Sequence, residues 1–173
     1  MKRKGKAAVC VFATMAILLG GCGGNGSEAP AAEASSEAVE VQETVNAKPV
    51  KDIYEEIKQS VELYSPVEMA DSFISNYYGI VPEKLEEYIF VMSEEATSAE
   101  TIVIMKVKDE ADVESISAAL QVVVDEKSAE MEDYLPEQFE IVDKSSVKTK
   151  GNYVYLVISE SADTIIGIIE NGI

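Results

Sequence analysis

The chain has 173 residues, of which 32 are acidic and 14 basic, with two cysteines and no histidine or tryptophan. Its formal net charge of −18 excludes a general nucleic-acid binder, because such proteins need lysine and arginine to displace phosphate counterions. Without histidine the chain has no Ser-His-Asp or Cys-His catalytic group and no imidazole metal ligand. A hydrophobic share of 47% is enough for one folded domain with appendages.

Residues 1–21 have the pattern of a secretory signal peptide. Four basic residues precede the apolar run over 7–19, which is shorter than the roughly 20 residues of a membrane-spanning helix. The next positions resemble the bacterial lipobox, in the order Leu19, Gly20, Gly21 and Cys22. The resemblance implies that cleavage leaves Cys22 first and that its thiol carries a diacylglyceryl group. We therefore expect a lipid anchor on the extracytoplasmic face of the cell membrane, and no other cofactor.

Residues 22–50 predict a disordered acidic linker after the lipidated cysteine. The segment is rich in Gly, Ala, Ser and Glu and has few large apolar side chains, so it cannot offset the entropy cost of folding. Removal of residues 1–21 would take away four basic residues and no acid, and the net charge would change from −18 to −22. We expect one folded domain over residues 51–173.

The first half of this domain predicts two helices and a pair of strands. Apolar residues at helical spacing indicate a helix over 52–63 and a second helix over 66–78, which Gly79 ends. Strand-like runs follow over 85–93 and 100–108, separated by a polar turn.

The second half predicts the longest helix, a hairpin and a closing helix. The long helix covers 109–134 and ends at Pro136. A tight turn at Gly151 joins the strands of a hairpin within 146–158, and a short helix covers 161–173. The order helix-ββ-long helix-ββ-helix predicts an α+β domain with a mainly antiparallel four-stranded sheet and helices on one face.

Four segments in this order resemble an uncharacterised family of small lipoproteins from clostridia-like Gram-positive bacteria. They are Asn76–Gly79, Ser98–Ile104, Asp133–Pro136 and Lys150–Val154, and the likeness extends over about 53–172. The resemblance implies a compact α/β domain outside the cytoplasm. The family carries no assigned activity, so it implies no catalytic residue.

Two motifs have a chemical and a structural interpretation. Ser145 and Lys148 have the S-x-x-K spacing of penicillin-binding enzymes, but a strand would direct side chains three apart to opposite faces, which favours a surface strand. Asp109, Glu110 and Asp112 precede the long helix, where acids cap the helix end, and a weak calcium site is the alternative. We assign no metal ligand.

Lys127 falls on the apolar side of the long helix. Its stem can lie along the core edge with the ammonium group in water, or Lys127 can form a semi-buried ion pair with Glu100 of the sheet. In the second case Lys127→Met should be better tolerated than Glu100→Gln or Lys127→Ala, because a lone buried charge is the costliest outcome.

The aromatic residues have core positions as their expected role and a ligand groove as the alternative. They are Tyr77, Tyr78, Tyr88, Phe90, Tyr134, Tyr153 and Tyr155. With no assigned catalytic residue, we expect a non-enzymatic, membrane-anchored module that binds an envelope protein or a small ligand. The alternative is a hydrolase that acts on envelope material through paired carboxylates.

Overall fold

A computed structural model describes residues 47–173, so the expected signal peptide, Cys22 and all but the end of the expected linker lie outside the described part. Five antiparallel strands form one sheet in the order β1-β2-β3-β5-β4. The strands are β1 (Pro66–Glu68), β2 (Leu85–Ser93), β3 (Thr101–Val107), β4 (Lys148–Lys150) and β5 (Tyr153–Ile158). The helices are α1 (Val50–Ser60), α2 (Asp71–Tyr78), α3 (Val113–Met131), α4 (Pro136–Asp143) and α5 (Ala162–Gly172).

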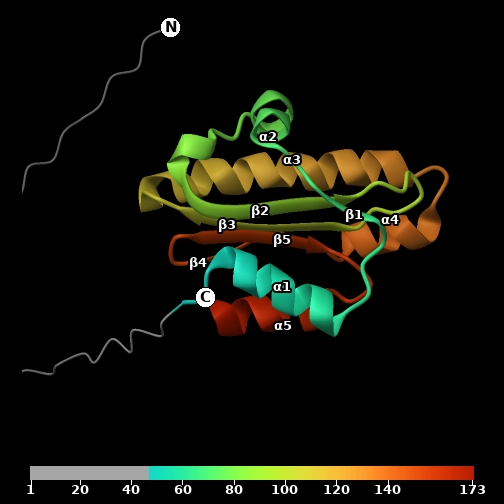
Figure 1. Ribbon diagram of the computed structural model, residues 1–173. Helices are drawn as coiled ribbons and strands as arrows, with labels where there is room; N and C mark the ends of the chain where they lie inside the picture. The colour runs from blue at the N-terminus through green and yellow to red at the C-terminus, as the bar shows by residue number, and fades with distance from the viewer. Residues whose placement is uncertain (1–46) are drawn as a thin grey trace, which may run out of the picture. The chain divides into compact units, whose positions relative to one another are not determined.

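The sheet is apolar on both faces, and a helical layer covers each face (Figure 1). Along β3, Val103 and Met105 belong to one buried cluster, whereas Ile102 and Ile104 belong to the other. This alternation follows from the two-residue period of a strand. A strand with no polar face needs cover on both sides, so the expectation of helices on one face only is wrong.

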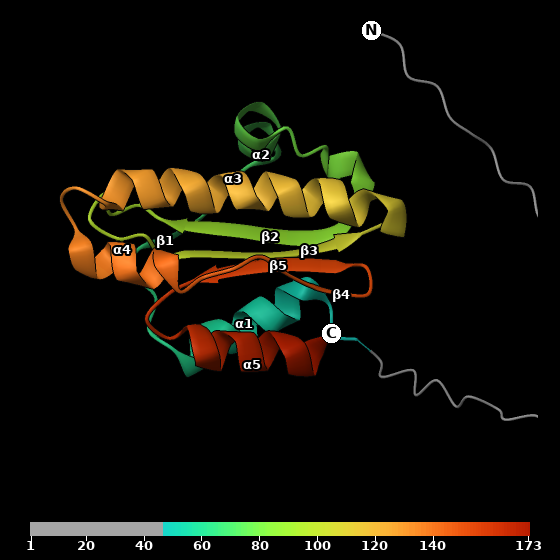
Figure 2. The same cartoon turned by 180° about the vertical axis from the view of Figure 1, so that it is seen from behind.

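The first layer is built mainly on α3, which lies along the sheet together with α2 and α4 (Figure 2). Ile116, Leu120 and Val123 of α3 are fully or almost fully buried against it. The opposite layer consists of α1 and α5, where Ile53 and Ile57 share a cluster with Ile165 and Ile169. The α+β class and the antiparallel pairing are therefore confirmed.

The fifth strand is β1, which was predicted to be part of a helix. Pro66 pairs with Ser93, and the preceding Ser65 has a positive φ of 42°. The helix that was expected over 66–78 begins only at Asp71. Its end is as predicted, because Gly79 adopts the left-handed conformation with φ 65° and its N–H group donates to the carbonyl of Ser75.

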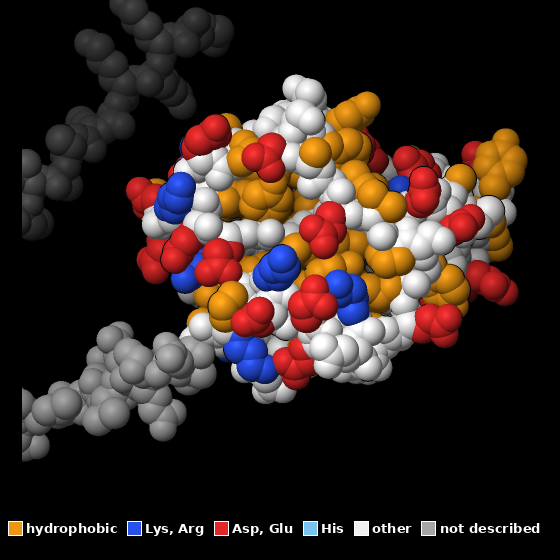
Figure 3. Space-filling view, viewed as in Figure 1, with side chains coloured by type: hydrophobic (Ala, Val, Ile, Leu, Met, Phe, Trp, Pro, Cys, Tyr) orange, Lys and Arg blue, Asp and Glu red, His pale blue; other side chains and the backbone are white. Residues whose placement is uncertain are grey.

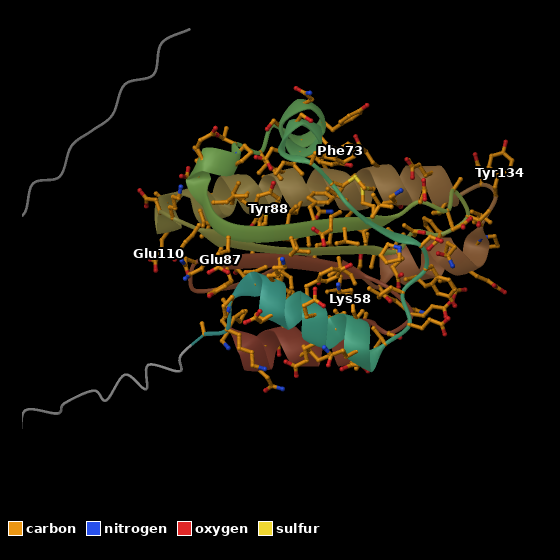
Figure 4. All side chains as sticks on the ribbon, in the orientation of Figure 1. Lys58, Phe73, Glu87, Tyr88, Glu110 and Tyr134 are labelled. Atoms are coloured by element: carbon orange, nitrogen blue, oxygen red, sulfur yellow. The ribbon has the colours of Figure 1, made fainter. Side chains whose placement is uncertain are left out.

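The long helix is also shorter than predicted. It ends at Met131, and Pro136 begins the new helix α4 instead of ending the old one. Proline is favoured at the first position of a helix, since that position needs no N–H donor. Tyr134, expected on the apolar side, lies between the two helices with 85% of its surface exposed and points away from the domain (Figure 4).

The chain enters the domain beside its C-terminal helix. The N–H group of Lys48 donates to the carbonyl of Gly172 at 2.8 Å, and the N–H group of Val50 donates to the Glu87 carboxylate at 2.7 Å. The backbone of Gly172 approaches Ile53 so closely that a Cβ atom there would lie 2.8 Å from Ile53 Cδ1. These contacts hold the chain from Lys48 to Val50, near the start of the described residues, against the α1–α5 layer.

Candidate functional site

The structure does not bring Glu100 and Lys127 together. The Lys127 Nζ atom lies 2.7 Å from Glu130 Oε2, within α3 itself, and only 14% of the lysine side chain is exposed. Because Glu130, one helical turn further along α3, supplies the negative charge, Lys127 needs no acid from the sheet.

Glu100 is the most unusual charged residue of the described part. Only 8% of it is exposed, and among residues 47–173 no lysine lies within 4.0 Å of its carboxylate. Its Oε2 atom accepts a hydrogen bond from the Tyr64 N–H group at 2.7 Å, and Oε1 accepts one from the Ser159 hydroxyl at 2.8 Å. Hydrogen bonds thus satisfy the buried charge and join three segments that are distant in sequence.

A cleft lies above Glu100 at one end of the sheet, and we name it the end cleft. It consists of two hollows, of about 380 and 530 Å³, and a narrow passage over Glu100 that shares lining residues with both. The passage is lined by Tyr64, Ser98, Glu100, Gln138, Ile141, Ser159 and Glu160. Glu160 lines all three parts, so they are adjacent to one another, and the passage itself holds only about 10 Å³.

Several connections of the fold line the end cleft, together with α4. They are the α1–β1 loop, the β2–β3 turn, the α4–β4 connection and the β5–α5 loop. Figures 1 and 2 show the α1–β1 loop, the β2–β3 turn, the start of α4 and the β5–α5 loop at the same end of the sheet. The chain enters near the other end, where α5 finishes at Gly172. The cleft and the point of chain entry are therefore separated by the length of α5, roughly 16 Å for an 11-residue helix.

The smaller hollow, which we name the charged groove, has walls of opposite charge. Lys144 and Lys148 line it from the α4–β4 connection, together with Ser145 and Ser146. Acids line it from the other side, at Glu160 and Asp163 around the start of α5, and the remaining lining residues are Ile141, Val157, Ser159, Ala162 and Ile166.

The S-x-x-K segment differs from its predicted conformation. Ser145 lies two residues after the end of α4, where its hydroxyl donates to the Val142 carbonyl at 2.6 Å, and the strand β4 begins only at Lys148. Because most of the segment is a loop, Ser145 and Lys148 line the same groove instead of opposite faces. The hydroxyl is engaged in ending the helix.

The acids before α3 have structural partners. Asp109 Oδ1 accepts a hydrogen bond from the Ala111 N–H group at 2.9 Å, and Asp112 lies 2.6 Å from Lys84 Nζ. Within residues 47–173, no three acidic or cysteine side chains are grouped so that they could hold a metal ion. The described helices also include none that is both long and apolar enough to span a bilayer.

The aromatic residues divide between the core and one surface. Phe90, Tyr153 and Tyr155 are buried as expected, but Tyr77 is 68% exposed, so the core position predicted for it is wrong. Its ring lies 4.7 Å from Phe73, measured between centroids. Figure 4 shows Phe73 and Tyr88 on the α2 side of β2, and Figure 3 shows hydrophobic side chains gathered between these two elements.

Two tyrosines of the sheet are hydrogen-bonded to acids. Tyr155 donates to Glu170 at 2.9 Å, and Tyr88 donates to Asp71. Burial, with the hydrogen bond and the negative charge of the acid, raises the pKa of each phenol to about 12. Both hydroxyls therefore stay protonated well above the usual tyrosine range.

Two helical layers around an antiparallel sheet, with a polar cleft at one end, define a small three-layer α+β domain. A family model described as a domain of unknown function (DUF4358) matches residues 59–159, more than half of the chain, so the chain belongs to this family. No curated protein and no solved structure matches the chain. The matched range holds all five strands and Tyr64, Glu100 and Ser159, whereas α5 lies beyond it.

Proposed function

We propose that this protein is a lipid-anchored extracytoplasmic binding module that takes a small polar ligand into the end cleft. The observation that carries the binding part is the end cleft itself, whose two hollows both share lining residues with the narrow passage over the hydrogen-bonded carboxylate of Glu100. Hollows of about 380 and 530 Å³ are in the range of small-molecule sites. Their open, polar lining suits a hydrophilic ligand.

The lipid anchor rests on the sequence around Cys22. A basic start, a short apolar run and the Leu-Gly-Gly-Cys order support diacylglyceryl transfer to the Cys22 thiol. The chain enters the folded domain at the end remote from the cleft, an arrangement that suits a ligand site facing away from the membrane.

The anchor is tested by cell fractionation of the Cys22→Ser variant. We expect the native chain in the membrane fraction with incorporated radiolabelled fatty acid, and the variant without label and outside that fraction. Cys10→Ser is the matched control, since it changes the other cysteine and leaves the lipobox intact. Equal labelling of Cys22→Ser and the native chain would contradict the proposal.

The ligand site is tested by photocrosslinking in cells. A photoreactive amino acid at Gln138, in the passage of the end cleft, should form an adduct that mass spectrometry of the purified protein detects. The same group at the exposed Val122 of α3 is the control. Identical adduct patterns at both positions, or none at either, would contradict a ligand site in the cleft.

The alternative is a carboxylate-based hydrolase of envelope material, and one observation favours it: Glu100 and Glu160 line the same passage. Against it, both oxygens of Glu100 already accept hydrogen bonds from the protein. The decisive assay incubates the protein with purified envelope glycan and measures new reducing ends. Release by the native chain and its loss in Glu160→Gln would establish the hydrolase instead of the binding module.

A further inference from the structure

We propose that the charged groove binds a zwitterionic ligand, a free amino acid or short peptide, with its carboxylate at the lysine wall and its ammonium group at the acid wall. This inference rests on the proposed function, because it names the class of ligand for one hollow of the end cleft.

Half of the ten lysines in residues 47–173 have an acid within 3.0 Å. These ion pairs, with Nζ–O distances of 2.6 to 3.0 Å, occur at Lys48, Lys58, Lys84, Lys106 and Lys127. Neither groove lysine has such a pair. Lys148 has no Asp or Glu within 4.0 Å among the described residues, and Lys144 reaches only Glu140, at 3.5 Å on its own helix end.

The two walls also do not neutralise each other. Within residues 47–173, no ion pair joins Lys144 or Lys148 to Glu160 or Asp163, although all four line the groove. A space of about 380 Å³ is left between them. Opposite charges that line one cavity without contact can both be satisfied by a molecule that carries both charges itself.

Other ligand chemistries fit the groove less well. A phosphate or a sulfate would pair with the lysines but would meet the carboxylates of Glu160 and Asp163, and like charges at short distance repel. A neutral sugar would leave both sets of charges without a partner. A peptide also matches the hydroxyl of Ser146, which can bond its amide groups, and the apolar lining at Ile141 and Val157, which can contact small side chains.

The test measures binding of alanine tripeptides to the full chain in detergent by calorimetry. The probes are trialanine in its L and D forms, its N-acetyl derivative, its C-terminal amide and the doubly blocked peptide. We expect one enantiomer of trialanine to bind, and blocking either end to weaken binding by about tenfold or more, which is the effect of roughly 1.4 kcal/mol. Equal binding of all forms, or no binding of any, would overturn the inference.

Two variants assign the ends of the ligand. In Lys148→Met the free peptide and its C-terminal amide should bind equally, whereas in Asp163→Asn the free and N-acetylated peptides should bind equally. Lys58→Met and Asp125→Asn, which lie on α1 and α3 away from the groove, should keep the native preferences. The reverse assignment, or no change in either preference, would overturn the inference even if both variants fold normally.

The outcomes also separate this inference from the proposed function. A photocrosslinked ligand at Gln138 together with no tripeptide binding would overturn the zwitterionic class and leave the binding module standing. The absence of both would contradict the two proposals together.

Discussion

The hydroxyl of Ser159 donates a hydrogen bond to the carboxylate of Glu100, with 2.8 Å between Oγ and Oε1. Ser159 follows the end of β5, and Glu100 precedes the start of β3. The same carboxylate accepts the N–H group of Tyr64 from the α1–β1 loop. One buried side chain therefore holds together the segments that form the floor of the end cleft.

Glu100→Gln should destabilise the domain. An amide has only one acceptor oxygen, so its NH₂ group would face either the Tyr64 N–H group or the Ser159 hydroxyl, and one donor would lose its acceptor. We expect a loss of about 1–3 kcal/mol in the free energy of unfolding, measured with urea. Ser159→Ala should cost about 0.5–1.5 kcal/mol, and the double variant should cost less than the sum of the two single variants.

The exposed Glu62 of the same cleft provides the control. Glu62→Gln should have a free energy of unfolding within about 0.5 kcal/mol of the native chain. Equal stability of Glu62→Gln and Glu100→Gln would show that the Glu100 carboxylate does not stabilise the domain through its two hydrogen bonds.

Lys127→Met should leave stability nearly unchanged. The ion pair with Glu130 is at the surface and contributes only about 0.2–0.5 kcal/mol to stability. Methionine has an unbranched apolar side chain, so it retains the packing that the buried methylene groups of Lys127 make. Lys127→Ala loses that packing and should be the less stable variant. Because Lys127 and Glu100 have separate partners, the costs of Lys127→Met and Glu100→Gln should add to within about 0.5 kcal/mol. A coupling of several times that size would instead support the ion pair with Glu100, which was one of the two alternatives that the sequence left open.

Two glycines of α5 should respond in opposite directions to alanine. At Gly172 the new Cβ atom would lie 2.8 Å from two side-chain atoms of the fully buried Ile53, so we expect a loss of about 1–3 kcal/mol. At Gly167 no atom lies within 4 Å of the new Cβ position, and alanine is the better helix former by about 0.5–1 kcal/mol. Thermal unfolding of both variants checks this contrast. A stabilised Gly172→Ala variant would mean that α1 moves away from α5 at little cost.

Alkaline pH should destabilise the domain through the half-buried Tyr88 and the buried Tyr155. Folding raises the pKa of Tyr88 and Tyr155 from 10.0 to about 12. Loss of water on burial disfavours the charged phenolate, and the neighbouring acid accepts a hydrogen bond from the protonated phenol and repels the phenolate. Their contribution to stability is complete below pH 10.0 and is lost as the pH rises through about 12. Urea unfolding at increasing pH, with tyrosinate absorbance recorded in parallel, measures the effect. Tyr155→Phe should flatten this pH dependence, whereas Tyr134→Phe, at an 85% exposed site, should not.

The sequence predicted the parts of the fold that depend on local patterns. The hairpin at Gly151, the end of α2 at Gly79 and the two long strands of the first hairpin follow from glycine conformation and strand periodicity. The strand β1 was not predictable in this way, because its three residues are all exposed and only their register with Val91–Ser93 makes them a strand.

The candidate site was predictable in residue type but not in arrangement. Glu100 was recognised as an acid within the sheet, but Ser159, its partner, is 59 positions away and belongs to a different hairpin. The second helical layer had a signal that could have been used. All six residues of Tyr153–Ile158 are apolar and buried, and such a strand requires cover on both sides.

The entry of the chain beside Gly172 determines how the domain would carry a mechanical load. A pull on the chain before residue 47 acts first on the Lys48–Gly172 hydrogen bond and on the start of α1. The α1–β1 loop with Tyr64 follows α1 in the chain, so unravelling from this side would remove the 11 residues of α1, a helix of roughly 16 Å, before it reached Tyr64 and the Glu100 carboxylate. If the chain is anchored as proposed, the α1–α5 layer would therefore yield to a pull before the end cleft does.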